Sequence, residues 1–166
     1  TTQENKGATN LNDLDINPLL VQADPGEIPR YCKEKHINAV PDTLDEKIWS
    51  EIKEKIKIDS ENKFKYEIEN TSRSVGTRLS HHIYKKVGNN KLKENTVQIK
   101  LEGSAGQSLG AFLTKGVKLI VEGDCNDYVG KGLSGGTIVV YPSTKSSLVS
   151  NENTIIGNTV LYGATS

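Results

Sequence analysis

The sequence predicts a mainly β protein built as a parallel β-helix, in which successive turns of chain stack and each strand pairs with its copy in the next turn. The first observation is a set of glycines that recurs with a shift of twenty residues. The second is that apolar residues stand at fixed distances from these glycines, so that stacked turns would align them in one core. The third is that these turns lead into short apolar segments, as expected for strands.

The glycine pattern occupies the second half of the chain. The glycines that we expect to be structural are Gly103, Gly110, Gly116, Gly123, Gly130, Gly132, Gly135, Gly136, Gly157 and Gly163. Moving the first three by twenty residues gives a second set that ends at Gly136, and a further shift of twenty-seven residues gives a third set with Ser150 in its first position. Glycine reaches positive φ and permits close backbone approach, which stacked corners require. We therefore interpret these glycines as corners.

Strands are predicted from alternating apolar residues. The segment 97–102, VQIKLE, alternates apolar and polar residues, and the segment 117–122, VKLIVE, follows it twenty residues later. A third strand is expected at 137–141. An irregular β-sandwich remains an alternative topology, whereas a leucine-rich repeat would need a leucine and asparagine ladder that this sequence lacks.

Four regions are predicted along the chain. Residues 1–10 are polar and are expected to be a disordered tail. Residues 11–41 are rich in proline and turn dipeptides and are expected to form an extended linker arm. Residues 42–95 form a helical cap region, and residues 96–166 begin a β-helix that we expect to be truncated at its C-terminal end.

Two helices are predicted in the cap region. The first has its N-cap at Asp42 and ends near Lys57, with an apolar stripe at spacings of four residues. The second is capped by Asn70 or Thr71 and stopped by Gly88. A short strand, 64–68, is expected between them, and the repeats are expected to begin at about residue 96.

Composition excludes several classes of partner. The chain has 21 basic and 21 acidic residues, so no net field favours nucleic acid or an acidic membrane surface. Its two cysteines, Cys32 and Cys125, lie far apart, which favours reduced thiols over a disulfide. No apolar stretch is long enough to cross a bilayer. We expect a soluble, intracellular protein without nucleic-acid or membrane partners.

One glycine-rich loop tests the possibility of nucleotide binding. Residues 130–136, GKGLSGG, contain the spacing G-x-G-x-x-G, which in a dinucleotide fold joins a strand to a helix. Here the loop leads into a predicted strand closed by Pro142, and the repeat already accounts for its glycines. A nucleotide-binding module that uses 130–136 is therefore the weaker interpretation.

The remaining candidate residues give no catalytic, cofactor-binding or metal-binding prediction. His81 and His82 are neighbours on a helix and point about 100° apart, so they do not form a two-ligand face. The cluster 124–127 lacks the glycine and distal glutamate of a calcium loop. Ser104 and Ser108 have no acid or histidine at a suggestive spacing. His36 is interpreted as a surface histidine. Arg73 and Arg78 could bind a carboxylate or phosphate, but ion pairing with the acidic first helix is the favoured interpretation.

Several long strings resemble one known family. The segments GSAGQSLGAFLTKGVKLIVEGDCNDYVGKGLSGGTIVV and NTIIGNTVLYGAT are similar to the GXGXG domain at the carboxyl end of the large chain of glutamate synthase. The segments LDINPLLVQADPG, PRYC, VPDTLDEKI and NTSRSVGTRLS resemble the linker and helix that precede this domain. The resemblance covers residues 11–166 and implies a right-handed β-helix.

The resemblance also implies a function for the parent chain. A glutamate synthase makes glutamate from glutamine and 2-oxoglutarate; an amidotransferase domain releases ammonia, which travels to a domain that holds FMN and an iron–sulfur cluster. Reducing equivalents come from NAD(P)H or ferredoxin. The GXGXG domain is implied to hold these domains together without catalytic residues. The fragment itself is therefore expected to be non-catalytic and to bind no cofactor, while its parent is an oxidoreductase.

Partners and compartment follow from the same resemblance. The expected partners are the other domains of the parent chain, together with self-association through the open end of the β-helix. The expected compartment is the cytoplasm or a plastid. The alternative from the same fold family is a GXGXG subunit of a formylmethanofuran dehydrogenase-like complex, against which the arm LDINPLLVQADPG argues because it resembles the synthase linker.

Overall fold

The computed structural model describes residues 15, 17–21, 26–27, 31–32, 34, 39, 41–88, 92–149 and 151–166. The chain divides into two units, 1–40 and 41–166, which are described separately. The predicted tail 1–10 and most of the predicted arm 11–41 lie outside the described residues. In the first unit α1 spans Asn17–Leu20, and the Asn17 N–H donates to Asp15 Oδ1 over 2.9 Å.

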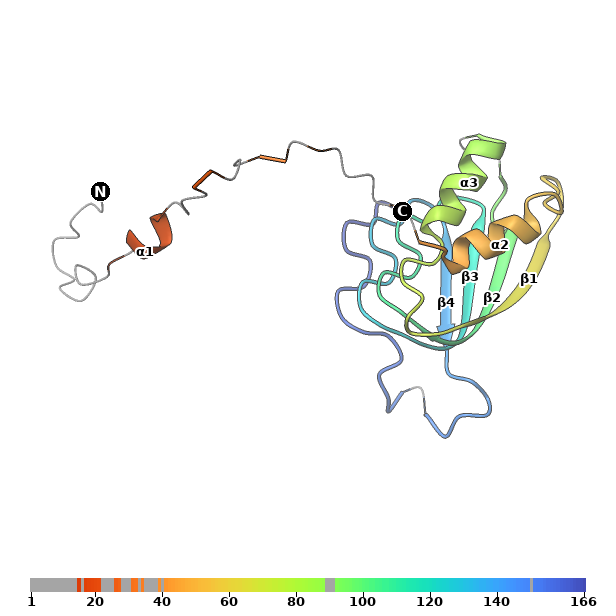
Figure 1. Ribbon diagram of the computed structural model, residues 1–166. Coiled ribbons are helices and arrows are strands. Elements are labelled where there is room, and N and C mark those ends of the chain that lie inside the picture. Colours follow the sequence, from red (N-terminus) through yellow and green to blue (C-terminus); the bar gives the residue numbers. More distant parts are fainter. Residues whose placement is uncertain are drawn as a thin grey trace. The chain divides into compact units, whose positions relative to one another are not determined.

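The second unit is mainly β, with a four-stranded parallel sheet in the order β1-β2-β3-β4 and few helices (Figure 1). The strands are β1 Asn62–Ile68, β2 Val97–Ala105, β3 Val117–Cys125 and β4 Thr137–Tyr141. Val97 pairs with Val117 and Gly103 with Gly123, which confirms the predicted shift of twenty residues. The strand predicted at 137–141 is also confirmed.

The strand predicted at 64–68 is confirmed as β1, and it extends the sheet by one strand before the predicted repeat. β1 pairs in parallel with β2, and its last residue, Ile68, lies opposite Gly103. The region 42–95 thus contributes a strand as well as helices. The glycine pattern does not reveal this first turn because Ile68 stands where the next turns have glycine and because a helix is inserted before β2.

The first helix of this unit, α2 (Leu44–Ile52), differs from its prediction at both ends. Its N-cap is Thr43 rather than Asp42, and the Thr43 side chain accepts a bond from the Glu46 N–H. It ends at Ile52 rather than near Lys57. The reason is that the Asn62 side chain bonds to the backbone of Lys57 in place of further helical bonds. Asn62 Oδ1 accepts the Lys57 N–H over 2.9 Å, and Asn62 Nδ2 donates to the Lys57 carbonyl over 2.8 Å.

The second helix, α3 (Thr77–Val87), starts later than the caps predicted at Asn70 or Thr71. The residues before it form a corner instead, in which Ser74 has φ of 53° and Gly76 has φ of 102°. Neither angle is compatible with a right-handed helix. Gly88 ends the helix as predicted, and its N–H donates to Tyr84 O over 2.8 Å.

The third turn has a different register from the predicted one. Cys125 forms a parallel bridge with Ile156, and the Gly132 N–H donates to Tyr162 O, so the shift is 31 residues rather than 27. Gly163 therefore occupies the place that Gly132 has in the preceding turn. Gly157 occupies the place of Asn126, because the N–H of each donates to a carbonyl of its preceding turn in the same way. The glycine spacing missed this register because a loop after β4 lengthens the turn.

The second set of glycines needs a smaller correction. β4 pairs with β3 at a shift one residue shorter than the twenty residues between β2 and β3, so Lys118 lies opposite Thr137. Gly135, with φ of 91°, thus takes the place that Gly116, with φ of 88°, has in the turn before. Gly136 follows this corner rather than forming it.

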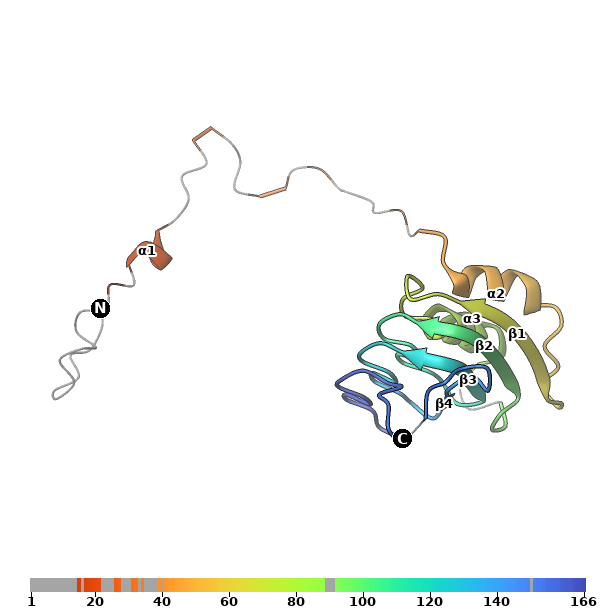
Figure 2. The ribbon, with the colours of Figure 1, turned by 90° about the horizontal axis from the view of Figure 1, so that it is seen from below.

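The core lies between the inner face of the sheet, the corners and the two helices. α2 lies beside β1 at one end of the stack, and the C-terminal turn lies at the other end (Figure 2). The largest fully buried side chains are Ile48, Ile52, Leu79, Ile83, Ile99, Leu101, Leu109, Leu113, Leu119, Val75, Val97 and Val117. Among the described residues, no helix has the length and apolar character needed to cross a membrane.

Candidate functional site

Glycine is required where adjacent strands approach each other most closely. Gly103 and Gly123 are paired in the sheet and have φ of 127° and 154°. A Cβ on Gly123 would lie 1.9 Å from the carbonyl oxygen of Gly103, and a Cβ on Gly103 would lie 2.1 Å from the carbonyl oxygen of Ile68. The contact is with backbone, so no side-chain rotation relieves it. These glycines permit stacking.

The corner glycines use their own amide groups to hold the turns together. Gly110 and Gly130 have φ of 66° and 67°, the left-handed region that the corner interpretation requires. The Gly110 N–H donates to Val75 O over 2.7 Å, and the Gly130 N–H donates to Leu109 O over 2.8 Å. The same carbonyl ladder repeats from turn to turn.

This ladder bears directly on the nucleotide-binding interpretation of 130–136. The N–H groups of Gly130, Gly132 and Gly136 all donate to carbonyls of neighbouring turns, so they do not face a ligand. The loop leads into β4 rather than into a helix. A dinucleotide site needs both free N–H groups and a following helix N-terminus. The loop geometry therefore favours the structural interpretation.

A buried carboxylate joins the two helices. Asp45, on α2 and 2 % exposed, accepts three backbone bonds at the start of α3: from Gly76 and Arg78 over 2.8 Å each and from Leu79 over 3.1 Å. Burial raises the pKa of this carboxyl, although the three N–H groups act in the opposite direction. Since α3 has no side-chain cap of its own, Asp45 supplies the acceptors that its first turn needs.

A polar cluster lies on the exposed side of the same helix pair. The Glu46 carboxylate contacts Arg78 Nη2 over 2.9 Å and His82 Nε2 over 2.8 Å. The His82 ring stacks on Trp49 with centroids 5.2 Å apart. The hydrogen bond from His82 and the nearby Arg78 charge hold the pKa of the Glu46 carboxyl below its usual value. The predicted ion pair between Arg78 and the first helix is confirmed, and His81 is exposed beside the cluster.

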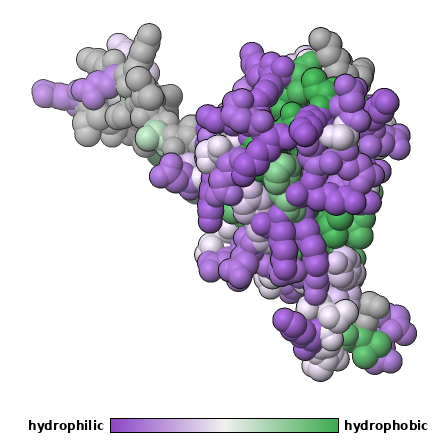
Figure 3. Space-filling view, turned by 90° about the vertical axis from the view of Figure 1, so that its right-hand side faces the viewer, coloured by the Kyte–Doolittle hydropathy of each residue, from purple (hydrophilic) through white to green (hydrophobic). Residues whose placement is uncertain are grey.

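Charged side chains cross the outer face of the sheet in alternating order. Lys65 contacts Glu102 over 2.8 Å, and Lys100 contacts Glu102 over 3.1 Å and Glu122 over 2.7 Å. Hydrogen bonds from these lysines lower the pKa of both glutamates, and the two carboxylates raise the pKa of Lys100. The side of the molecule seen in Figure 3 is largely hydrophilic. The in-register strands place like charges opposite one another, and the diagonal pairs compensate for them.

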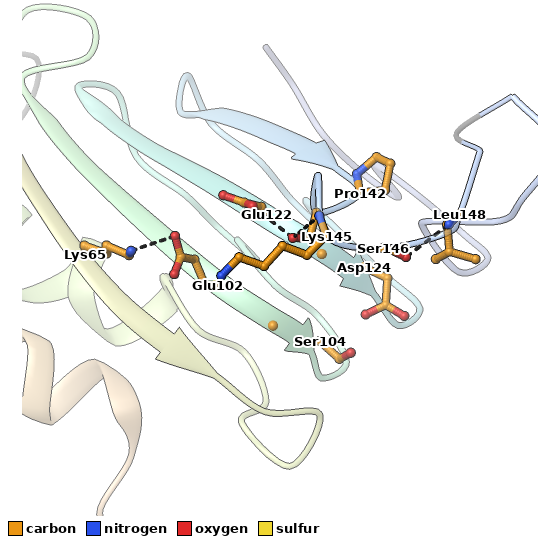
Figure 4. A pocket seen from close by; sticks show the side chains of 12 residues that line it. Lys65, Glu102, Ser104, Glu122, Asp124, Pro142, Lys145, Ser146 and Leu148 are labelled. Atoms are coloured by element: carbon orange, nitrogen blue, oxygen red, sulfur yellow. Dashed lines mark hydrogen bonds and ion pairs between the residues drawn. The ribbon is translucent and has the colours of Figure 1, made fainter.

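An open groove of about 510 Å³ runs between the strand ends and the loop that follows β4 (Figure 4). Its floor carries Glu102, Ser104 and Asp124, and the loop contributes Lys145. The Ser143 hydroxyl donates to Glu122 over 3.0 Å and ties the loop to the sheet. Two of the carboxylates in the groove are thus already engaged in ion pairs or hydrogen bonds of the fold.

Other candidates from the sequence lie apart from one another. Ser104 is at the exposed end of β2, whereas Ser108 has φ of 62° at a corner. Asp127 accepts the Asn158 N–H over 2.7 Å, a bond between turns. Cys125 is buried, and burial raises the pKa of its thiol to about 12. His36 lies outside the described residues. Within the described part of the chain, no group of three or more His, Cys, Asp or Glu residues could hold a metal ion.

The sequence patterns did not identify two residues that are important in the structure. Asp45 stands three residues before Ile48 and seven before Ile52, so it lies on the buried stripe of α2, and an acid on such a stripe is the signal that could have revealed it. Asn62 joins three segments by donating to the carbonyls of Lys57, Ser60 and Thr96. No spacing rule identifies it.

Comparison with known proteins gives a consistent result. The family model described as GXGXG motif matches residues 45–166. The chain is 54 % identical over 163 residues to the glutamate synthase [NADPH] large chain of Azospirillum brasilense, which covers 98 % of this chain and 11 % of that protein. It is 43 % identical over 157 residues to the glutamate synthase [NADH] of Saccharomyces cerevisiae, with 93 % of this chain and 7 % of that protein covered.

A third relative is named for a different electron donor. The ferredoxin-dependent glutamate synthase 2 of Synechocystis is 40 % identical over 155 residues, with 92 % of this chain and 10 % of that protein covered. The chain thus spans only about a tenth of the length of these relatives.

Proposed function

The chain belongs to the GXGXG-motif family, and from this we propose that it is a non-catalytic structural domain of a glutamate synthase large chain. In this role it holds an amidotransferase domain and an FMN- and iron–sulfur-binding synthase domain together. The parent enzyme makes glutamate from glutamine and 2-oxoglutarate. The observation that carries the proposal is the use of the motif glycines for stacking: corner amides such as those of Gly110 and Gly130 bond to neighbouring turns, and Gly103 and Gly123 permit close backbone contact between strands.

We infer that the stacked turns are the start of a right-handed β-helix. Support comes from the parallel, in-register pairing of four strands and from corner amides that donate to the preceding turn. A connection between parallel neighbouring strands is right-handed in about 98 % of cases. Each strand would then pair with its copy in the next coil, with the apolar side chains inside.

The cofactors of the parent do not fit the residues of this segment. An iron–sulfur cluster is generally held by several cysteine thiolates, whereas the whole sequence contains two cysteines, one of them buried in the core. The glycine N–H groups that could approach a flavin phosphate donate to carbonyls of the fold. We therefore assign FMN, the cluster and the NAD(P)H or ferredoxin interaction to other parts of the parent chain.

The partners that follow are the other domains of the parent and, through the last turn, a second copy of the chain. The outer edge of β4 has no strand beyond it in the described sheet. Val160 is 44 % exposed, whereas Leu109 and Val129 in the corresponding places of earlier turns are 1 % and 2 % exposed. An exposed apolar side chain at this place favours contact with another polypeptide.

Cross-linking mass spectrometry of the full-length chain tests the proposal. Amine-reactive cross-links should join exposed lysines of this segment, such as Lys63 and Lys65, to lysines of both catalytic domains. The control is the same reaction after urea unfolding, which should remove the pattern. Cross-links confined to residues 41–166, with these lysines still reactive, would contradict the role in holding domains together.

The alternative is a GXGXG subunit of a formylmethanofuran dehydrogenase-like complex. The relatives described above are glutamate synthases that match over 98 % and 93 % of this chain, which must include most of its first forty residues and favours the synthase.

A further inference from the structure

A pocket of about 520 Å³ lies between α3 and the corner of the following turn. His81 and Tyr84 line it from the helix, and Phe112 and Thr114 line it from the corner. Tyr84 is 47 % exposed and Phe112 is 57 % exposed. Two aromatic side chains thus face solvent at the same depression.

The backbone at Phe112 is unusual for an aromatic residue. Its φ is 54°, and the residues in the same place of the next two turns are glycines, Gly132 with φ of 61° and Gly163 with φ of 69°. A bulky side chain in this region of φ is a genuine outlier and costs conformational free energy. The ring rests on Gly132, since a Cβ there would lie 2.6 Å from Phe112 Cε1, but more than half of the residue remains exposed. Tyr128 and Leu161 share a positive φ and partial exposure, so it is the place of Phe112 in the pocket that points to a role in binding.

The chemistry of the walls restricts what the pocket can bind. The Thr77 hydroxyl donates to Ala111 O over 2.8 Å, and Ser80 Oγ accepts the Thr114 N–H over 3.3 Å. Each hydroxyl thus makes one bond within the fold. No Asp, Glu, Lys or Arg is found among the described residues that line the pocket, so a free amino acid would find no counter-charge there. The rings of Tyr84 and Phe112 offer apolar contact beside the polar side chains of the walls, which suits a side chain without charge.

We propose that this pocket seats an apolar side chain from a polypeptide segment of another domain of the parent chain. The inference rests on the proposed function, because it names the place at which the structural domain engages its partner. The relatives are about ten times longer than this chain, so in them such a segment is tethered at high effective concentration. Exposed aromatic residues in a concave site are the usual anchors of protein interfaces.

The variant Phe112→Gly separates docking from folding. Glycine restores the residue that the next two turns have and removes the ring, so residues 41–166 of the full-length chain should keep their hydrogen-exchange protection. Docking should weaken roughly 30-fold, as expected for the loss of an aromatic anchor. The matched control is Tyr128→Ser, because Tyr128 is 41 % exposed, has φ of 64° and lies outside this pocket, while Ser108 stands in its place one turn earlier.

Docking is measured by photo-cross-linking in the full-length chain, with p-benzoyl-phenylalanine in place of Tyr84. We expect adducts to a peptide of another domain, with a yield that falls strongly in Phe112→Gly and is unchanged in Tyr128→Ser. Adducts confined to residues 41–166, or a yield unaffected by Phe112→Gly, would each overturn the inference. If lysine cross-links still reach the other domains, the pocket alone is refuted; if those also fail, the proposed function falls with it.

Discussion

The closest backbone contact in the sheet allows a sharp test by the substitution Gly123→Ala. Gly123 lies on β3, in register with Gly103 on β2. An added Cβ would stand 1.9 Å from the Gly103 carbonyl oxygen, whereas real Cβ atoms essentially never approach a heavy atom within 3.0 Å. The backbone of the two strands must therefore separate by about 1 Å at this point.

Two terms contribute to the expected loss of stability. A φ of 154° is rarely adopted by residues with side chains and costs about 1–3 kcal/mol. Separating the strands weakens about two ladder hydrogen bonds, each with a net value of about 1 kcal/mol, and loosens the core behind them. We expect Gly123→Ala to lower the free energy of unfolding by about 4 kcal/mol, a large part of the 5–15 kcal/mol typical of a domain.

Gly163→Ala is the matched control. Gly163 also has positive φ, at 69°, but nothing lies within 4 Å of an added Cβ. Its cost is limited to the left-handed backbone, about 1–2 kcal/mol. Urea unfolding followed by far-UV circular dichroism and by the fluorescence of Trp49, the single tryptophan, measures both variants. If Gly123→Ala costs no more than Gly163→Ala, the stacking argument is refuted.

Three further predictions concern individual side chains. Asp45→Ala should lower the free energy of unfolding by about 2–4 kcal/mol, because it leaves N–H groups at the start of α3 without their acceptor, and Asp45→Asn should cost less in the same urea titration. Because the pKa values of Glu102 and Glu122 are lowered in the folded state, their ion pairs stabilise the fold above pH of about 4.5, and this stabilisation is lost as the pH falls through the folded pKa. The double substitution of both glutamates by Gln should therefore flatten the acid side of a curve of unfolding free energy against pH. An unchanged acid side would count against the ion-pair ladder. Thiol titration with a chromogenic disulfide should find Cys32 reactive in the folded chain and Cys125 reactive only after unfolding, whereas rapid reaction of both would contradict the burial of Cys125.

The regular part of the fold could be predicted from the sequence. The twenty-residue shift identified the pairing of Val97 with Val117, because equal coil lengths bring equivalent residues into register. The same reasoning failed where a coil changed length. The helix inserted before β2 concealed the pairing of β1 with β2, and the loop after β4 moved the partner of Cys125 to Ile156.

Side chains that join separate segments were harder to predict. Asp45 caps a helix that starts 32 residues later along the chain, and its acceptor role depends on how α2 packs on α3. The exposure of Phe112 could not be predicted either, since only the observed register shows that glycines occupy the equivalent position in the next two turns. Spacing rules describe neighbours along one element, whereas these contacts arise from tertiary packing.

The loop after β4 is the clearest departure from a regular stack. It forms the lobe at the lower end of Figure 3, where hydrophobic atoms are exposed. Leu148 is 44 % exposed and Val149 is 47 % exposed, and Ser143 anchors the loop to Glu122. Its extra length is not needed to close a turn, since the preceding turn closes with a shift of twenty residues.

The proposed structural role can be examined by comparing coupled and partial activities in a full-length glutamate synthase that carries this segment. Gly123→Ala and Gly163→Ala would be assayed for glutamine-dependent glutamate synthesis and for glutamine hydrolysis alone, while hydrogen exchange reports whether the segment is folded. A structural role predicts that Gly123→Ala loses about tenfold or more of the coupled synthesis, because domains that are no longer held together lose their effective concentration, yet keeps hydrolysis. Coupled synthesis at the level of the Gly163→Ala control, in a chain whose segment has lost its exchange protection, would contradict the account.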